Sequence, residues 1–345
     1  MAARMSPGGV SPCWNGFSDD RIRGAGYLTL EPGGLSSGQR SLAVCGVCGA
    51  LFPWHQPFEL SAVVQDMAAT LEHRGPDRLA VWVAGEGTVG FGHTRLAVVD
   101  LSEAGHQPMT SADGRWTITY NGELYNIDDL RRRLGGFRWR GHSDTEVLIE
   151  YVARHGVVTA LEAVRGMFAF GCWDAENSEL WLARDRFGEK PLYYGWHRGT
   201  FLFASELKAL RAVPGFDPGI DRESLREYFR WANVPAPSTI YEGVYKLPPA
   251  HYMRVRGASS RPLPVPYWSA LEVAKAAPVL PEDADAVDHL GEVLDCAVRA
   301  QMVADVPLGA FLSGGVDSSS IVAAMQRQSS TPVRTFTIGF SEPSY

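Results

Sequence analysis

The hydrophobic pattern of the chain becomes regular at Val44, where short apolar runs begin to alternate with amphipathic stretches. Glu59–Leu71 carries apolar residues at helical spacing, and Asp144–Val152 is a second predicted helix that Ser143 can cap. Apolar runs bounded by glycines and polar turns predict strands. The predicted strands are Ala80–Val83, Val89–His93, Trp116–Tyr120, Met167–Trp173, Leu180–Ala183, Leu192–Trp196 and Phe201–Ala204. The pattern predicts a layered, mostly antiparallel α/β arrangement over about Cys45–Ala204.

A proline-rich passage separates this region from a second one. Prolines cluster between Pro235 and Pro266, which predicts a linker or an irregular edge. The elements predicted beyond it are a helix over Asp285–Met302, a strand over Leu308–Leu312, a helix over Ser318–Gln326 and a strand over Val333–Phe340. Strand, helix and strand at this spacing predict one parallel βαβ unit, which leaves its sheet uncovered and cannot be a whole domain.

The composition is that of a soluble globular protein with two domains: 345 residues, 45% hydrophobic and 21% charged. With a net charge of −7 and no long Lys/Arg run, nucleic acid is not an expected partner. No apolar run reaches the roughly 20 residues that span a bilayer, so a membrane is not expected either. The odd number of cysteines (Cys13, Cys45, Cys48, Cys172 and Cys296) argues against a disulfide framework and favours the cytoplasm.

The stretch Val44-Cys45-Gly46-Val47-Cys48-Gly49 contains a Cys-x-x-Cys, which is typical of a redox pair or of half a metal site. A thioredoxin-like pair opens a helix, and a zinc site needs a second pair of ligands at suitable spacing. The strand-like run here fits neither. The alternative is that Cys45 is a nucleophile followed by a glycine turn, although 44 residues precede it.

The second region contains a glycine loop between its first strand and the next helix, with the sequence Leu-Ser-Gly-Gly-Val-Asp-Ser-Ser from Leu312. Alone, this would be an ordinary turn capped by serines. Between a strand and a helix, its N–H groups and hydroxyls can bind an anion, and Asp317 can hold Mg²⁺. It resembles the pyrophosphate-binding loop of the N-type ATP pyrophosphatases. That resemblance implies an ATP site formed by Leu312, Ser313, Gly314, Gly315, Asp317, Ser318 and Ser319, with Ile338 beside the adenine.

The first region contains five motifs in a fixed order. They are His73–Asp77, His93–Asp100, Tyr120–Asn126, Ser143–Glu146 and Arg184–Leu192. Together they resemble the glutamine-hydrolysing domain of the asparagine synthetase family, within the N-terminal-nucleophile (class II) amidotransferases. The resemblance implies a four-layer αββα glutaminase domain followed by the beginning of a parallel-sheet α/β ATP pyrophosphatase domain. The expected boundaries are a leader over 1–44, the glutaminase domain over 45–250, a linker and edge over 251–284, and the truncated synthetase domain over 285–345.

The resemblance also assigns roles to the residues of the first region. Cys45 is the nucleophile, with its own α-amino group as base, and Asn121 and Gly122 supply the oxyanion donors. Arg95 binds the glutamine α-carboxylate and Glu123 and Asp144 bind its α-ammonium, while Leu96, Val98 and Val99 line the pocket. Singly, Asn121-Gly122 is typical of a hairpin turn, Arg95 and Asp144 of surface charges, and Glu123 of a helix cap. Their joint order favours the catalytic interpretation, and His73 and His93 are left structural.

The function implied is that of a glutamine-dependent ligase that cleaves ATP to AMP and pyrophosphate, with Mg²⁺, and amidates aspartate to asparagine. One alternative is an amide synthetase of secondary metabolism that acts on another carboxylic acid. Another is a glutaminase-only fragment, because the chain stops soon after one βαβ unit. A third alternative, a degenerate, non-catalytic protein, would have lost pocket residues. It is disfavoured because the pocket residues are all present, namely Arg95, Asn121, Gly122, Glu123 and Asp144. The resemblance leaves a homodimer open.

The leader bears on the mechanism, because an amide nitrogen is not basic and Cys45 needs a free α-amine. Either a pro-segment of 44 residues is cleaved, or translation naturally starts at position 44, where Val44 directly precedes the nucleophile. The unpatterned, Gly/Ser-rich composition of the leader favours the second route. We therefore expect the natural protein to begin at position 44 and to expose Cys45.

Overall fold

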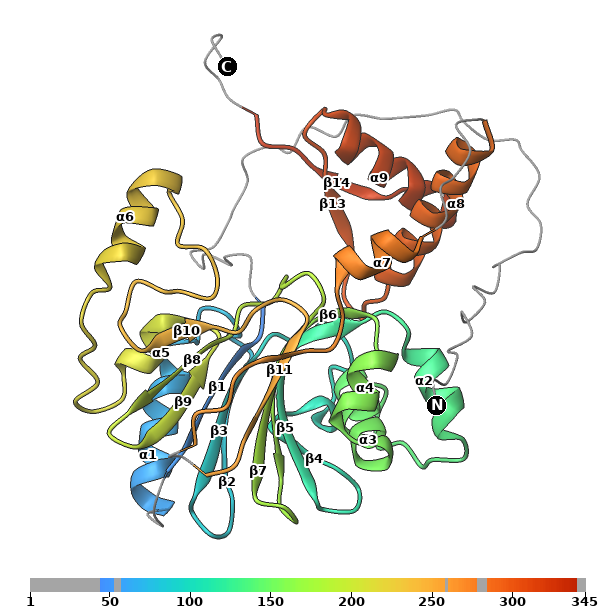
Figure 1. The fold of residues 1–345 in the computed structure, drawn as a ribbon. Helices are drawn as coiled ribbons and strands as arrows, with labels where there is room; N and C mark the ends of the chain where they lie inside the picture. The colour runs from blue at the N-terminus through green and yellow to red at the C-terminus, as the bar shows by residue number, and fades with distance from the viewer. Residues whose placement is uncertain (1–43, 53–56, 258–259, 278–283, 340–345) are drawn as a thin grey trace, which may run out of the picture.

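The computed structural model describes residues 44–52, 57–257, 260–277 and 284–339 (Figure 1). Within these residues, two six-stranded sheets lie face to face. The first sheet contains, in spatial order, β10 (Val244–Lys246), β8 (Tyr193–His197), β9 (Thr200–Ala204), β1 (Gly46–Leu51), β3 (Val89–Arg95) and β2 (Arg78–Val83). The second contains β12 (Val265–Pro266), β11 (His251–Val255), β7 (Glu179–Arg184), β6 (Gly166–Asp174), β5 (Trp116–Leu124) and β4 (Met109–Thr110). Both are antiparallel.

Helices cover the outer face of each sheet and complete the four-layer αββα fold that the sequence predicted (Figure 1). The first sheet is covered by α1 (Pro57–Ala69) and α5 (Leu207–Arg211), and the second by α2 (Ile127–Leu134), α3 (Asp144–His155) and α4 (Val157–Ala163). α6 (Arg222–Trp231) lies beyond α5. Ser143 caps α3 as predicted, since its side chain accepts a hydrogen bond from the Glu146 N–H.

Three clusters of buried side chains separate the layers. The central cluster lies between the sheets and contains Phe91 and Phe203 from the first sheet and Trp173 from the second. The other two lie between the first sheet and α1 and between the second sheet and α2–α4. Because both faces of each sheet are buried, most strands read as continuous apolar runs in the sequence rather than as alternating ones.

The strands and helices predicted between Glu59 and Ala204 are all present, with small differences at their ends. The largest difference is in β5, which was expected to end at Tyr120 and continues to Leu124 because β6 pairs with it throughout. Asn121-Gly122 therefore lies inside a strand, and the interpretation of this pair as a hairpin turn is wrong. The sequence did not predict α2, α4, α5, α6 or the short strands β4, β10, β11 and β12.

Part of the proline-rich passage belongs to the second sheet. β11 pairs with β7, and β12 pairs with β11 at the edge. The segment 251–284, expected as linker and edge, thus contributes β11 and the edge strand β12 to the second sheet before α7 (Ala270–Ala276) begins. Of the expected leader over 1–44, residues 1–43 lie outside the described residues.

The C-terminal unit is the parallel βαβ arrangement that the sequence predicted. β13 (Gly309–Phe311) and β14 (Arg334–Phe336) pair in parallel around α9 (Val316–Gln328), which packs on α8 (Ala284–Gln301). The prediction of a strand as far as Phe340 is wrong in its extent. β14 stops at Phe336, where β13 offers no further partner, and Phe340 itself lies outside the described residues. Within the described part, this unit buries a cluster of only Val298, Ala324 and Met325.

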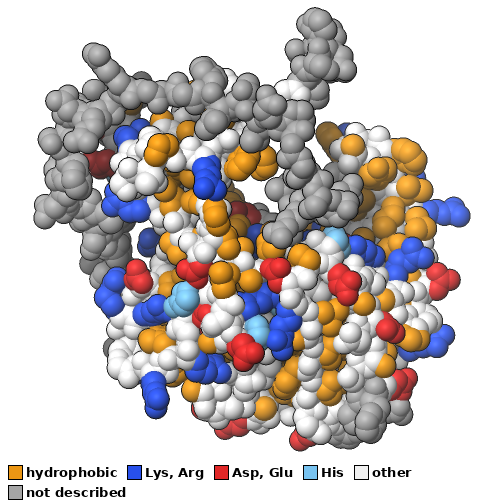
Figure 2. Space-filling view, turned by 180° about the vertical axis from the view of Figure 1, so that it is seen from behind, with side chains coloured by type: hydrophobic (Ala, Val, Ile, Leu, Met, Phe, Trp, Pro, Cys, Tyr) orange, Lys and Arg blue, Asp and Glu red, His pale blue; other side chains and the backbone are white. Residues whose placement is uncertain are grey.

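The surface of the molecule is mixed in character. Acidic and basic side chains are interspersed over the face shown in Figure 2, between apolar ones. Some of the exposed apolar side chains belong to α6, namely Tyr228, Phe229 and Trp231. Among the described helices, none is both long and apolar enough to cross a membrane.

Phe203 sets how closely the two sheets approach, because its ring occupies space left by a glycine in each sheet. A Cβ added at Gly49, its cross-strand neighbour, would lie 2.5 Å from the ring, and one at Gly171 of the facing sheet would lie 2.4 Å from it. Both distances are far inside van der Waals contact. The side-chain atom that glycine lacks is therefore excluded at both positions by the same ring.

We predict that Gly171→Ala lowers the free energy of unfolding by about 1–3 kcal/mol through overpacking. Urea denaturation measures the change. Gly85→Ala is the matched control, because nothing lies within 4 Å of a Cβ there, and its effect should be small. Phe203→Leu should relieve the clash, so that the double variant is less destabilised than the sum of the two single ones. Additive effects would contradict this packing account.

Candidate active site

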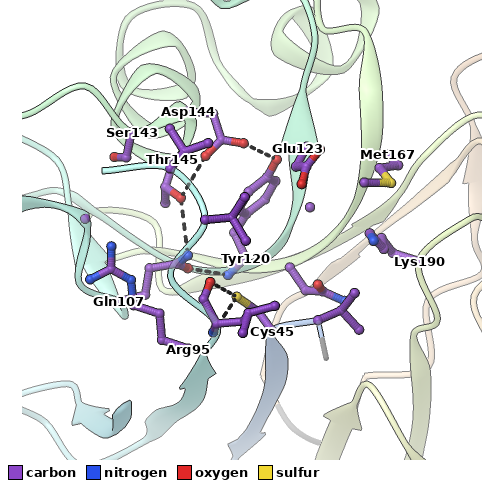
Figure 3. A pocket seen from close by; sticks show the side chains of 17 residues that line it. Cys45, Arg95, Gln107, Tyr120, Glu123, Ser143, Asp144, Thr145, Met167 and Lys190 are labelled. Carbon is purple, nitrogen blue, oxygen red and sulfur yellow. Dashed lines mark hydrogen bonds between the residues drawn. The ribbon is translucent and has the colours of Figure 1, made fainter. Parts of the chain in front are cut away.

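A pocket of about 120 Å³ opens at one end of the two sheets, and Cys45 lies in its wall (Figure 3). Cys45 directly precedes β1, Arg95 ends β3, Asn121 lies near the end of β5, and Asp144 begins α3. All the pocket residues predicted for the first region line it, namely Cys45, Arg95, Leu96, Val98, Val99, Asn121, Gly122, Glu123 and Asp144. Strands from both sheets thus bring together residues that are far apart in the sequence.

The Cys45 thiol contacts the backbone of Leu96. Its Sγ donates to the Leu96 carbonyl at 3.6 Å and accepts from the Leu96 N–H at 3.4 Å. Burial raises the pKa of the thiol above its ordinary value, although the Leu96 N–H and the charges of Arg95 and Lys190 act in the opposite direction. A thiol with a raised pKa is mostly protonated at neutral pH, so it needs a base before it can act as a nucleophile.

Asn121 presents an unpaired donor in the same pocket. Its side chain is 1% exposed, and among the described residues its Nδ2 has no hydrogen-bond partner. Leaving such a group buried and unpaired destabilises a protein by about 1–3 kcal/mol. Gly122, the next residue, lies so close to β6 that a Cβ would be 2.4 Å from the Met167 carbonyl oxygen. The strand therefore requires glycine beside the unpaired amide.

Arg95 is buried, and a loop that follows it holds its guanidinium. Nη1 donates to the Ser102 carbonyl at 3.1 Å, and Nη2 donates to the Asp100 carbonyl. Gly105 makes room for this arrangement, because a Cβ there would lie 2.4 Å from Nη2. Two of the five guanidinium N–H groups are used in these bonds, and the positive charge is not neutralised by them.

A closed ring of four hydrogen bonds fixes the acidic side of the pocket (Figure 3). The Tyr120 N–H donates to Gln107 Oε1 at 2.7 Å, and Gln107 Nε2 donates to Thr145 Oγ1 at 3.2 Å. Thr145 Oγ1 donates to Asp144 Oδ1 at 3.5 Å, and the Tyr120 hydroxyl donates to Asp144 Oδ2 at 2.8 Å. Burial raises the pKa of Asp144, and burial together with Asp144 raises the pKa of Glu123. Two carboxylates that are desolvated side by side are suited to a cationic ligand.

Lys190 lies in the pocket, although the sequence analysis gave it no role (Figure 3). Its side chain is largely buried, and burial lowers its pKa while the Glu123 charge raises it. The loop that carries Lys190 is held by the buried carboxylate of Asp185. This carboxylate accepts hydrogen bonds from the backbone N–H groups of Phe168, Phe187, Glu189 and Lys190. Lys190 belongs to the Arg184–Leu192 motif, so the sequence analysis found the motif but assigned no role to this residue.

Arg74 is a second residue with an unforeseen role. Its Nε donates to the Cys45 carbonyl at 3.1 Å, and its Nη1 pairs with Glu206 at 2.9 Å. His73 also binds Glu206, at 3.0 Å. Arg74 therefore orients the backbone of the candidate nucleophile, and the motif that begins at His73 supports it. Tyr120 begins the Tyr120–Asn126 motif but was given no role, and Gln107 lies outside all five motifs.

The Cys-x-x-Cys leads into the strand β1 rather than opening a helix, and its two thiols are not paired with each other. Cys48 is buried within β1, its Sγ donates to the Val64 carbonyl, and burial raises its pKa to about 12. Cys45 and Cys48 are both free thiols, and the described residues contain no group of three or more potential metal ligands. His93 is buried and contacts the Tyr120 carbonyl, and burial lowers its pKa to about 4, which fits a structural role.

The glycine loop of the C-terminal unit lies between β13 and α9, as predicted. Gly315 caps α9 without a side-chain hydrogen bond, so the first N–H groups of the helix have no side-chain cap. Gly314 has a φ of +81° and faces open space. Ser313 and Ser318 contact each other at 3.0 Å, and Ser319 bonds the Gly315 carbonyl. An anion fits this helix start.

The other predicted members of this second site lie close to the loop. The Leu312 N–H donates to the Phe336 carbonyl at 2.9 Å, and Thr337 Oγ1 donates to the Leu312 carbonyl at 2.7 Å. Ile338 follows directly and is 76% exposed. Asp317 lies in the first turn of α9. The structure thus brings the predicted ATP-binding residues together at one end of the βαβ unit.

Comparisons with known proteins cover both regions of the chain. The chain matches the glutamine amidotransferase domain family over residues 44–268 and the asparagine synthase family over residues 289–345. It is 38% identical over 316 residues to asparagine synthetase [glutamine-hydrolyzing] 3 of Bacillus subtilis, which covers 87% of this chain and 48% of that protein. It is also 38% identical over 263 residues to amidase chry2 of Gibberella zeae, covering 75% of this chain and 38% of the relative.

A solved structure of glutamine phosphoribosylpyrophosphate amidotransferase from B. subtilis aligns with a TM-score of 0.47 and 18% identity, over 85% of this chain and 65% of that one. The chain spans about half or less of the length of the two curated relatives.

The position of Lys190 generates a prediction about the Cys45 thiol. Lys190→Met removes a cation that lowers the pKa of Cys45, so the thiolate fraction at a fixed pH should fall. We predict that alkylation of Cys45 by iodoacetamide at pH 8 slows by about two- to tenfold, given that one pKa unit changes the thiolate fraction tenfold. Peptide mass spectrometry reports the modification. Lys275→Met, at an exposed lysine of α7 outside the pocket, is the control and should leave the rate unchanged. Equal rates in all three proteins would show that Lys190 does not act on the thiol.

Proposed function

The chain belongs to the glutamine amidotransferase domain family, and from this premise we propose that its first domain releases ammonia from glutamine. The ammonia is used for an ATP-dependent amide synthesis, and the C-terminal unit is the first part of the domain that carries it out. The overall reaction is glutamine-dependent asparagine synthesis. Glutamine and water give glutamate and ammonia, while ATP converts the aspartate β-carboxylate to an acyl-adenylate and pyrophosphate. Ammonia then displaces AMP to give asparagine.

One observation supports the first half of this proposal: the buried amide of Asn121, which has no partner in the described part of the chain, lines the same pocket as the Cys45 thiol. A thiol attacks a carbonyl carbon to give a tetrahedral intermediate whose oxygen carries a negative charge. A preorganised donor that has no partner in the free protein stabilises that oxyanion without first breaking another hydrogen bond. A purely structural asparagine would have its amide paired.

The proposed steps at Cys45 follow from these groups. Once Cys45 is N-terminal, its α-amine, with an ordinary pKa of about 8, takes the thiol proton. The sulfur attacks the side-chain carbonyl carbon of glutamine, and Asn121 and the Gly122 N–H donate to the oxyanion. The C–N bond breaks, the α-ammonium gives its proton to the leaving nitrogen, and ammonia departs. Water then hydrolyses the γ-glutamyl thioester and releases glutamate and the thiol.

The charges of the pocket support glutamine as the substrate. Arg95 provides a fixed positive charge for an α-carboxylate, while Glu123 and Asp144 provide negative charge for an α-ammonium. The two poles lie on different elements, at the end of β3 on one side and at β5 and α3 on the other. The zwitterionic end of a free amino acid matches this arrangement, and a peptide-bonded glutamine would lack both charges.

The second half of the proposal rests on the glycine loop. The uncapped start of α9, with Gly314, Gly315 and the hydroxyls of Ser313, Ser318 and Ser319, is suited to a pyrophosphate group. Asp317 would hold Mg²⁺, which neutralises phosphate charge when bound. The exposed side chain of Ile338 would contact the adenine.

Two carboxylic acids are candidates for the acceptor of the ammonia. Aspartate is favoured by the asparagine synthase match over residues 289–345. Another carboxylic acid is the second candidate, since amidase chry2 is equally similar over a shorter length. Small molecules are the proposed partners, with neither nucleic acid nor membrane, and the free thiols fit a cytoplasmic protein. Assaying the full-length gene product against a panel of carboxylic acids, with pyrophosphate release as the signal, separates the acceptors.

Glutaminase activity tests the carrying observation. In a protein that begins at Cys45, we expect Asn121→Ala to lower kcat for glutamate release by about 10²–10³-fold, as loss of an oxyanion donor does elsewhere. Asn233→Ala, at an exposed position, is the control and should stay within about twofold of wild type. The chain that still begins at Met1 should be nearly inactive. Wild-type kcat in Asn121→Ala would remove the oxyanion role, and full activity of the chain beginning at Met1 would remove the α-amine mechanism.

The separation of the two sites gives another prediction. In a protein that contains the whole synthetase domain, Asp317→Ala should abolish ATP-dependent synthesis and spare glutaminase activity, because Asp317 lies outside the glutamine pocket. Coupled assays of pyrophosphate and glutamate measure the two activities. Asp288→Ala on the exposed face of α8 is the control and should retain both. Equal loss of both activities in Asp317→Ala would contradict the assignment of two sites.

A further inference from the structure

Asp305 connects the C-terminal unit to the glutamine pocket. It lies between α8 and β13, and its backbone N–H donates to the Val98 carbonyl at 2.9 Å. Its Oδ2 accepts hydrogen bonds from the Asp100 N–H and from His142 Nε2, both at 2.6 Å. All three partners belong to the first domain, and Asp100 and Asp305 are 205 residues apart in the sequence. The roles proposed above for the pocket residues do not explain why these three groups bind Asp305.

The segment that Asp305 binds is the loop that holds Arg95. Val98 and Val99 line the pocket, and the carbonyl of Asp100 accepts from the Arg95 guanidinium. Asp100 is fully buried and has a φ of +54°, a left-handed conformation that few residues other than glycine, asparagine and aspartate adopt. That conformation persists only where surrounding bonds enforce it.

The bonds that enforce it come from both domains. Within the first domain, Asp100 Oδ1 accepts from the Ser102 hydroxyl and N–H, and Asp100 Oδ2 accepts from the His142 N–H at 2.8 Å. The Asp100 N–H, however, is bound by Asp305 of the C-terminal unit. The hydrogen bond from His142 lowers the pKa of Asp305, so its carboxylate is ionised at neutral pH and is a strong acceptor.

A second contact between the units lies behind the same wall. A small cavity is lined on one side by Val99, Glu123 and Asp144, which also line the glutamine pocket. On the other side it is lined by Ala300, Gln301 and Val303, at and just beyond the end of α8. The C-terminal unit therefore contacts the pocket wall through residues between Ala300 and Asp305, and Asp305 makes the hydrogen bonds.

We propose that Asp305 is a positioning residue for glutamine binding: by holding the loop over residues 98–102, the docked C-terminal unit keeps Arg95 where it can bind the α-carboxylate. The inference rests on the proposed glutaminase function. It makes the affinity for glutamine depend on whether the C-terminal unit is docked. By reciprocity, bound glutamine stabilises docking to the same extent. The synthetase side can thereby control ammonia release without touching Cys45.

Steady-state kinetics of the glutaminase reaction provide one test, in the protein that begins at Cys45. Asp305→Ala should raise KM for glutamine by about tenfold, within the range typical of coupling between sites, while kcat changes less than about twofold. Asp305→Asn keeps an oxygen that can accept from the Asp100 N–H and should restore KM to near the wild-type value. An unchanged KM in Asp305→Ala, or a fall in kcat alone, would overturn the proposal.

Asp295→Ala is the matched control. Asp295 lies on α8, pairs with Arg327 inside the C-terminal unit, and has a side chain 32% exposed against 38% for Asp305. Its loss weakens the same unit without touching the first domain, so KM should not change. An equal rise in KM for Asp295→Ala would show that general loosening of the unit, and not the Asp305 contact, is responsible.

Hydrogen exchange separates this inference from the proposed function, because it needs no turnover. In the full chain, Asp305→Ala should speed amide exchange in the peptide that covers residues 96–105 by about tenfold or more, whereas Asp305→Asn and Asp295→Ala should not. Unchanged exchange would overturn the positioning role even in a protein that hydrolyses glutamine. Faster exchange in a protein that hydrolyses no glutamine would place the failure in the proposed function instead.

Discussion

A buried amide N–H without a partner is an unfavourable feature that a folded protein rarely keeps. Among the residues that the structure describes, Asn121 has no partner for its side-chain amide in the wall of the pocket that contains Cys45. The rest of the first domain can be understood as the support for it. Pairing of β5 with β6 through Leu124 prevents Asn121 from relaxing into a turn, and Gly122 lets the two strands approach. The ring of bonds through Gln107 and Tyr120 fixes the backbone one residue away. The unpaired donor is thus held by neighbours that are themselves paired.

The charged side chains of the pocket also have few partners of opposite charge. Arg95 is held by backbone carbonyls rather than by a carboxylate, so it keeps its full charge. Glu123 and Asp144 are desolvated near Lys190, and each of these groups has a pKa shifted toward its neutral form. In the proposed complex, the α-carboxylate of the ligand would face Arg95 and its α-ammonium would face Glu123 and Asp144. The free pocket is therefore preorganised for a ligand with separated positive and negative ends, at the expense of its own stability.

The sequence predicted a large part of this arrangement. The order of the motifs predicted roles for Cys45, Arg95, Asn121 and Asp144, and the structure places all four around one pocket. It could not show that Asn121 lacks a partner, since that depends on where every neighbouring side chain lies. Gln107 was invisible because a glutamine in a loop has no pattern. The contact of Asp305 with the first domain depends on the docking of two units, and neither sequence periodicity nor spacing contains that information.

The central claim is that Cys45 attacks glutamine and passes through a covalent γ-glutamyl thioester. Rapid-quench mass spectrometry tests it most directly, on a protein with Cys45 at its amino terminus mixed with glutamine and stopped in acid. Our account predicts a γ-glutamyl adduct on the N-terminal peptide that forms before glutamate accumulates, and no adduct and no hydrolysis in Cys45→Ala. An adduct on any other residue, or glutamine hydrolysis that continues unchanged in Cys45→Ala, would contradict it.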